Sequence, residues 1–199
     1  MMDTSIYIQK IVKRTIDLVF SILIVILFSP ILLIISILIK VTSKGPVLIK
    51  RKRIGQNQNL FYYYAFRTMR IDSSEMIINE AKKITTDPRI TSIGKFLRKY
   101  SLDEIPSFIN IIKGDMSLVG PRPSLLLDIQ HLTEQEKKRY NVRPGFTGYW
   151  QTYGREKNIQ DLKKMAEYDI YYIENWTIWF DIKILLYTVF RSFKAKGAY

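Results

Sequence analysis

Two adjacent carboxylates, Asp103 and Glu104, and an arginine held between two prolines, Arg122, are the residues of this sequence best suited to chemistry. Pro106 follows the carboxylates, and because proline is tolerated mainly in the first turn of a helix, a short helix is predicted to begin near it. Gly114 suits the position just after the end of that helix. The carboxylates would then lie among unpaired backbone N–H groups at the positive end of a helix, where a phosphate can also bind.

Each half of this pattern has a simpler interpretation. Ser101 to Glu104 also matches a capping box, in which both polar side chains satisfy backbone donors. With Ser101 as the N-cap, however, Pro106 would take the fifth helical position and remove a needed hydrogen bond. The flanking prolines make the turn around Arg122 stiff, and a guanidinium presented in this way suits a bidentate grip on a phosphate. A solvated turn with a chance arginine is the alternative.

Composition narrows the class of partner. The chain has 199 residues, which suits one compact domain plus an anchor. With 31 basic and 18 acidic residues its formal charge is +13, which indicates an acidic partner such as phospholipid headgroups, a nucleotide or nucleic acid. The sequence has no cysteine and a single histidine, His131, so disulfides, thiolate zinc sites and histidine-rich metal sites are excluded.

Residues 18–39 form an apolar run without a charged side chain, and at about 1.5 Å per residue they reach roughly 33 Å, enough to cross a bilayer core. Ser29 and Pro30 lie in the middle of the run. Pro30 removes a backbone hydrogen bond, so a bend is predicted near Ser29, whose hydroxyl can satisfy the carbonyl that is freed.

Basic residues flank the apolar run on both sides, and by the positive-inside rule both ends favour the cytoplasm. A helix broken at the Ser-Pro pair, which enters and leaves by one face, satisfies both clusters. A straight span with one pass is the alternative. The flanking residues are Lys10, Lys13 and Arg14 before the run and Lys40, Lys44, Lys50, Arg51, Lys52 and Arg53 after it.

A β-hairpin is predicted from residues 47–53 and 60–69, which are rich in β-branched and aromatic residues and flank a polar stretch at 55–59. The Lys-Arg-Lys-Arg run at 50–53 is interpreted as a solvated strand face beside anionic lipid, where each charge contributes about 1 kcal/mol.

Helical patterns follow at 72–83, 93–100, 134–140 and 176–193. In the second, one face is expected to be buried, made of Ile93, Phe96, Leu97 and Tyr100. The last places Trp, Tyr and Phe at helical spacing beside basic residues, which is typical of a helix in the headgroup region; a core-facing helix is the alternative. Residues 143–155 form a glycine-rich loop with two arginines and four aromatics, which can be interpreted as a base-stacking surface, a sugar-binding platform or a packed loop.

Taken together, three motifs resemble the bacterial sugar transferase family, the monotopic polyprenyl-phosphate phosphoglycosyl transferases. They are SLDEIP at 101–106, GDMSLVGPRP at 114–123 and RPGFTG at 143–148. The likeness extends from the membrane segment to about residue 190. It implies an α+β, mainly helical fold with a re-entrant membrane helix over 1–45, hinged at Ser29 and Pro30. Residues 46–199 would form a catalytic domain at the membrane interface, with a small β-hairpin and amphipathic interfacial helices.

The resemblance also implies roles for residues. Asp103 would be the nucleophile, and Glu104 its acid/base partner; both are the expected ligands of Mg²⁺. Arg98, five residues before Asp103, and Arg122 would clamp phosphate. Further substrate-binding candidates are Arg67, Arg89, Arg143, Arg155 and Gln151. One motif, Phe66 to Met69, departs from the family at the residue before it, where a lysine is usual and this sequence has Ala65.

The activity implied is transfer of a sugar-1-phosphate from a UDP-sugar to undecaprenyl phosphate, with release of UMP, through an aspartyl phospho-sugar intermediate. Such a reaction initiates capsule, exopolysaccharide or glycoconjugate synthesis at the cytoplasmic face of the bacterial inner membrane. Anionic membrane lipid is an expected partner, nucleic acid is not, and a homo-oligomer is left open. The alternatives are a non-catalytic, membrane-anchored basic binding module and a lipid-linked phosphatase. The sequence does not name the sugar.

Overall fold

A computed structural model describes residues 4–70, 87–154 and 161–194, with side chains placed up to residue 190. The predicted helix at 72–83 and the candidate Arg155 lie outside these residues. The helices are α1 Thr4–Thr42, α2 Ser92–Lys99, α3 Phe108–Lys113, α4 Leu162–Glu174 and α5 Ile178–Lys194. The strands are β1 Leu48–Ile54, β2 Leu60–Phe66, β3 Ser117–Val119 and β4 Gly145–Thr147. The expected mainly helical fold with a small antiparallel hairpin is confirmed.

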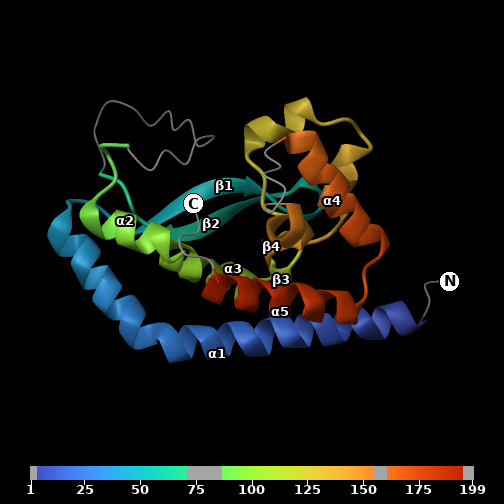
Figure 1. Cartoon of the computed structure of the whole chain (residues 1–199), viewed down its shortest axis with the longest axis horizontal. Coiled ribbons are helices and arrows are strands. Elements are labelled where there is room, and N and C mark those ends of the chain that lie inside the picture. Colours follow the sequence, from blue (N-terminus) through green and yellow to red (C-terminus); the bar gives the residue numbers. More distant parts are fainter. Residues whose placement is uncertain (1–3, 71–86, 155–160, 195–199) are drawn as a thin grey trace.

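Helix α1 runs along one side of the molecule, beneath α5 and α3, and turns toward α2 at its far end (Figure 1). It is long and apolar enough to cross a membrane. The chain stays helical through Ser29 and Pro30, so an interruption of the helix there is not observed. The Ser29 hydroxyl donates a hydrogen bond of 2.7 Å to the Ile26 carbonyl, four residues before Pro30. Because that is the carbonyl a proline leaves without its N–H partner, the predicted compensation by Ser29 is confirmed.

The first part of α1 is fixed to the rest of the chain by polar contacts. Lys13 forms a 2.6 Å ion pair with Asp181 of α5 and donates to the Val119 carbonyl. Arg14 donates to the carbonyls of Ile111 and Ile112 at the end of α3. Lys13 and Arg14, which the sequence analysis used as a basic flank of the apolar run, therefore bind protein groups.

The last part of α1 is attached as well. Ile35 and Ile39 are buried with Phe66 and Leu97 in a small core cluster. Just beyond the helix, the Arg67 guanidinium donates to the backbone carbonyls of Ser43 and Lys44. One stripe of α1 thus packs on the domain along the helix, while its other faces expose large apolar side chains.

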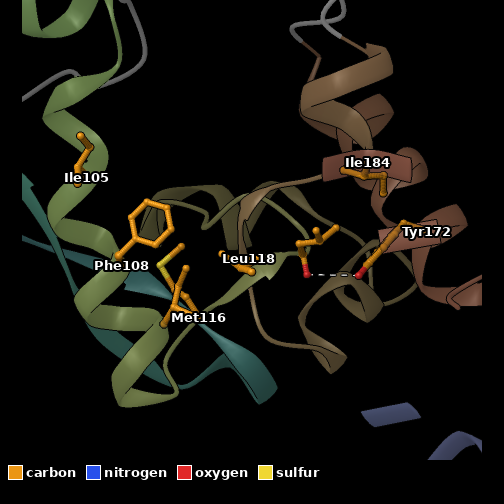
Figure 2. Packing of buried hydrophobic residues seen from close by; sticks show 8 residues of the cluster. Ile105, Phe108, Met116, Leu118, Tyr172 and Ile184 are labelled. Carbon is orange, nitrogen blue, oxygen red and sulfur yellow. Dashed lines mark hydrogen bonds between the residues drawn. The ribbon is translucent and has the colours of Figure 1, made fainter. Parts of the chain in front are cut away.

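The main core lies between the hairpin, α3, β3 and the two C-terminal helices. Figure 2 shows Leu118 of β3 between Phe108 and Met116 on one side and Tyr172 and Ile184 on the other. The Tyr172 hydroxyl donates to the Val119 carbonyl at 3.3 Å, which joins α4 to β3. The core therefore connects the site-bearing segments at 102–123 to the C-terminal helices.

Two helix faces differ from the sequence expectation. In α2, Leu97 is buried, but Phe96 and Tyr100 are half-exposed and pack on each other with ring centroids 5.0 Å apart. In α5, Ile184 is buried while Trp179 is 71% exposed. Helix α5 has a core-facing side, as the alternative interpretation expected, and an opposite side with exposed apolar residues, for which a position in the headgroup region stays a prediction. The predicted loop at 143–155 contains β4 and a π-helical turn, Trp150–Gly154.

Candidate active site

The carboxylates Asp103 and Glu104 lie on a 3-10 turn, Leu102–Ser107, that leads directly into α3. Within the described residues, the Ser101 side chain caps no backbone N–H, so the capping-box alternative is not formed. Helix α3 begins at Phe108, two residues after the predicted start. Gly114 follows it with φ of 93°, which confirms the predicted helix end.

The hairpin lies over this turn, and one residue of α3 fixes its position. Asn110 is fully buried, accepts a hydrogen bond from the Tyr64 N–H at 3.0 Å and donates to the Tyr62 carbonyl at 2.7 Å. Its side chain thereby occupies the hydrogen-bonding edge of β2 as a further strand would. The contact sets the distance between the hairpin and the carboxylate turn.

The turn that carries Arg122 is held by a parallel pair of short strands. Strand β3 pairs with β4, and the Gly145 N–H donates to the Pro121 carbonyl at 2.8 Å. A Cβ on Gly145 would overlap the backbone nitrogen of Gly120. The GPRP and RPGFTG motifs are therefore in direct backbone contact, which explains their glycines by close approach.

A buried ion pair contacts the backbone of the turn that carries Arg122. Arg139, from the 3-10 turn Glu136–Asn141, lies 2.6 Å from Asp169 of α4, and both side chains are almost fully buried. Arg139 also donates to the Arg122 carbonyl at 3.3 Å. The Arg122 guanidinium is about one-third exposed, and one of its nitrogens lies 3.9 Å from Glu104 Oε1.

These segments surround one cavity, which contains the two carboxylates. Among the residues predicted to form the site, Asp103, Glu104, Arg122 and Gln151 line it. The Gln151 side-chain oxygen is buried and has no hydrogen-bond partner among the described residues, while its nitrogen donates to the Phe146 carbonyl. Because Asn and Gln oxygens are good acceptors, this atom is suited to a donor group of a ligand.

Other predicted phosphate ligands lie elsewhere in the part of the chain that the structure describes. Arg67 is 3% exposed and holds the segment after α1. Arg89 forms a close pair with Asp87, and hydrogen bonds from its guanidinium and its backbone N–H lower the pKa of that carboxyl to about 2. Arg98 donates to the Thr68 hydroxyl at 2.9 Å, and Arg143 is exposed. None of the four belongs to the cavity lining, and the role proposed for Arg67 conflicts with its burial against backbone carbonyls.

Three lining residues with polar or charged side chains were missed by the sequence interpretation: Arg51, Arg53 and Tyr63. The strand register pairs Arg51 with Tyr63, so both side chains lie on the face of the hairpin that covers the carboxylates. The sequence did contain a signal for these residues, because lysine and arginine alternate along residues 50–53. Exposure along β1 alternates in the same way: the lysines are exposed and the arginines are half-buried. The solvated-face interpretation therefore holds for the lysines and is wrong for the arginines.

Electrostatically the cavity combines both signs of charge. Burial raises the pKa of the Tyr63 phenol, and the negative charges of Glu104 and Asp103 act in the same direction. Tyr63 is consequently a neutral hydrogen-bonding group at ordinary pH. In the described part of the chain, no group of three or more Asp, Glu, His or Cys residues is placed to hold a metal alone. Two carboxylates do fit Mg²⁺, which commonly completes its oxygen shell with water and substrate phosphates.

Comparison of the sequence with known proteins identifies a family and several relatives. Residues 8–195 match the model of the family described as bacterial sugar transferase. The chain is 39% identical over 96% of its length to the UDP-glucose:undecaprenyl-phosphate glucose-1-phosphate transferase of Escherichia coli, and covers 42% of that protein. It is 40% identical over 96% of its length to the undecaprenyl-phosphate galactose phosphotransferase of Salmonella typhimurium, again covering 42%.

A third relative transfers a different sugar by name. It is the UDP-N-acetylgalactosamine-undecaprenyl-phosphate N-acetylgalactosaminephosphotransferase of Aeromonas hydrophila, 36% identical over 94% of this chain and 45% of the relative. The chain thus spans less than half the length of these relatives. Their names share the lipid acceptor and differ in the sugar.

Proposed function

This chain belongs to the bacterial sugar transferase family, and we propose on that basis that it moves a sugar-1-phosphate from a UDP-sugar to undecaprenyl phosphate, releasing UMP. The observation that carries the proposal is the cavity in which Asp103 and Glu104 lie beside the Pro-flanked Arg122. Two carboxylates supply a nucleophile and a proton acceptor, and a fixed guanidinium suits a phosphate.

In the proposed first step, a carboxylate oxygen of Asp103 attacks the sugar-bearing phosphorus of the UDP-sugar. A new oxygen–phosphorus bond forms, the bond to the bridging oxygen breaks, and UMP leaves with that electron pair. The acyl phosphate left on Asp103 is itself reactive. Arg122 offsets the negative charge that develops on the phosphoryl oxygens.

In the second step, an oxygen of the lipid phosphate attacks the same phosphorus, and the Asp103 carboxylate leaves. Glu104 accepts the proton that the lipid phosphate carries in its monoanionic form. The product is a polyprenyl diphospho-sugar, and the enzyme returns to its starting state once Glu104 has released the proton to solvent. Asp103 and Glu104 are also the residues that would hold Mg²⁺, which would neutralise charge on the diphosphate.

The attachment of α1 supports a re-entrant path through the membrane. Both ends of the helix contact the same domain, through Lys13 at one end and Ser43 at the other. A straight crossing would require that domain to reach both faces of the bilayer. We place the domain at the cytoplasmic face, with the exposed faces of α1 and α5 in lipid and the exposed Lys50 toward anionic headgroups.

The test is release of UMP from a panel of UDP-sugars by detergent-solubilised protein with undecaprenyl phosphate and Mg²⁺. The panel includes UDP-glucose, UDP-galactose and UDP-N-acetylgalactosamine, because the relatives' names contain these sugars. Release with one donor is expected. It should be lost in Asp103→Asn and on chelation of metal, but retained in Lys138→Gln, a variant at an exposed position. Folded protein that releases no UMP with any donor would favour the non-catalytic binding module instead.

A further inference from the structure

The cavity wall formed by the hairpin has an unusual composition. Ala65 contributes a small apolar side chain beside Asp103 and Glu104, at the position where the family motif usually has lysine. The reaction proposed above brings a diphosphate, and then a lipid phosphate, into a site that already contains two carboxylates. Such a site requires cations, and Arg122 is about one-third exposed, which weakens its effect by solvent screening.

The strand register shows where a further cation comes from. Strand β1 pairs with β2 so that Ile49 is opposite Ala65 and Arg51 is opposite Tyr63. Arg51 and Ala65 are therefore diagonal neighbours on one face of the hairpin. Diagonal neighbours lie roughly 7–8 Å apart, within reach of a long side chain. Arg53 is opposite Phe61, one pair further from Ala65.

We propose that Arg51 supplies from β1 the positive charge that Ala65 does not supply from β2, and that it binds the donor diphosphate opposite Asp103. This inference rests on the proposed function and identifies a substrate-binding residue that the motifs alone do not indicate. An arginine on β1 can replace a lysine on β2 in this role because a guanidinium binds phosphate through two parallel hydrogen bonds. It also stays charged at every working pH, so it acts as a clamp and does not donate a proton.

The hairpin itself provides a matched control. Lys52 is the next residue of the same strand, carries the same charge, and is exposed on the opposite face. Arg51→Gln and Lys52→Gln therefore remove one positive charge each from adjacent positions. We expect Arg51→Gln to lower kcat/KM for the UDP-sugar by about 100-fold, as loss of one charge-stabilising group does, and Lys52→Gln to change it by less than about twofold.

A rescue experiment separates this role from a structural one. Ala65→Lys in the Arg51→Gln background is expected to recover at least about tenfold of the lost kcat/KM, because the charge returns to the same part of the cavity. The rescued enzyme should also lose activity above about pH 10, where lysine deprotonates, while the wild-type enzyme retains its arginine charge. In the Arg53→Gln background the same lysine should give no recovery.

Several results would overturn the inference. They are equal activity of Arg51→Gln and Lys52→Gln, a folded double variant no more active than Arg51→Gln, or equal rescue of the Arg53→Gln variant. Thermal unfolding of each protein identifies any variant that has lost its fold. If the wild-type protein releases no UMP, the proposed transfer itself fails. Equilibrium binding of UDP then tests separately whether Arg51 binds the diphosphate. Arg51→Gln should bind UDP at least about tenfold more weakly than Lys52→Gln, and equal binding would refute the role of Arg51.

Discussion

Substitution of Gln151 is expected to weaken binding of the UDP-sugar without lowering the stability of the protein. Its side-chain oxygen is buried in the cavity wall without a hydrogen-bond partner among the described residues. Replacing it by the similarly sized, apolar Met removes this unsatisfied acceptor but also the hydrogen bond from the Gln151 amide nitrogen to the Phe146 carbonyl. The two effects oppose each other, so Gln151→Met should leave the unfolding midpoint nearly unchanged. The same change should raise KM for the UDP-sugar about tenfold, since a ligand donor loses its partner. A lower midpoint together with an unchanged KM would show that Gln151 has only a packing role.

Tyr63 gives a prediction about alkaline pH. Its folded-state pKa is raised, so above pH 10 the phenol ionises in the unfolded chain but stays neutral in the folded one. Its stabilising contribution is therefore complete below pH 10 and is lost as pH rises further. Between pH 9 and 11 the wild type should lose about 1.4 kcal/mol more free energy of unfolding than Tyr63→Phe. Urea unfolding of both proteins at the two pH values measures the difference, and parallel losses would contradict it.

At the scale of elements, the contact between β3 and β4 depends on a glycine. A methyl group on Gly145 meets the backbone of Gly120, which cannot move without separating the strands. Gly145→Ala should therefore cost about 3 kcal/mol or more of unfolding free energy. Gly114→Ala is the comparison, because only its positive φ is unfavourable, and it should cost about 1–2 kcal/mol. Equal losses in chemical denaturation would argue against close approach as the reason for Gly145.

Asn110 makes an equivalent prediction for the hairpin. Asn110→Leu removes the partners of the Tyr64 N–H and the Tyr62 carbonyl and leaves both unsatisfied. The loss should be about 2–4 kcal/mol, against less than about 1 kcal/mol for the exposed Asn175→Leu. Denaturant midpoints of the two variants test this, and similar midpoints would mean that the hairpin is held mainly by its apolar contacts.

The same elements show which features were readable from sequence. The hairpin and the end of α3 were predicted because alternation and Gly114 are local signals. Strands β3 and β4 are three residues each and pair across 28 positions, so no local pattern reveals them. Arg51 was misread for a related reason: alternation shows that a strand has two faces, but only the folded partner decides which face is covered. The pairing of Arg139 with Asp169 likewise depends on tertiary contact.

At the scale of the whole molecule, the attachment of both ends of α1 predicts a topology. The chain has no cysteine, so single cysteines can be introduced without background. Lys10→Cys and Lys40→Cys, both on exposed positions of α1, should react with a membrane-impermeant maleimide from the same side of sealed vesicles. That side should be the cytoplasmic one, judged by vesicles of known orientation. Labelling from opposite sides would establish a straight crossing, and the cysteine-free parent protein gives the baseline.

The contacts of the first part of α1 also have a consequence for the order of folding during synthesis. Lys13 binds Asp181, and Asp17 accepts a hydrogen bond from the Leu118 N–H, so partners of the first twenty residues come from the middle and the end of the chain. These polar groups cannot be satisfied until most of the polypeptide has been made. Helix α1 is therefore made before these partners and reaches its final position only when α5 has emerged. Synthesis of α5, and not that of α1, closes the structure around the site.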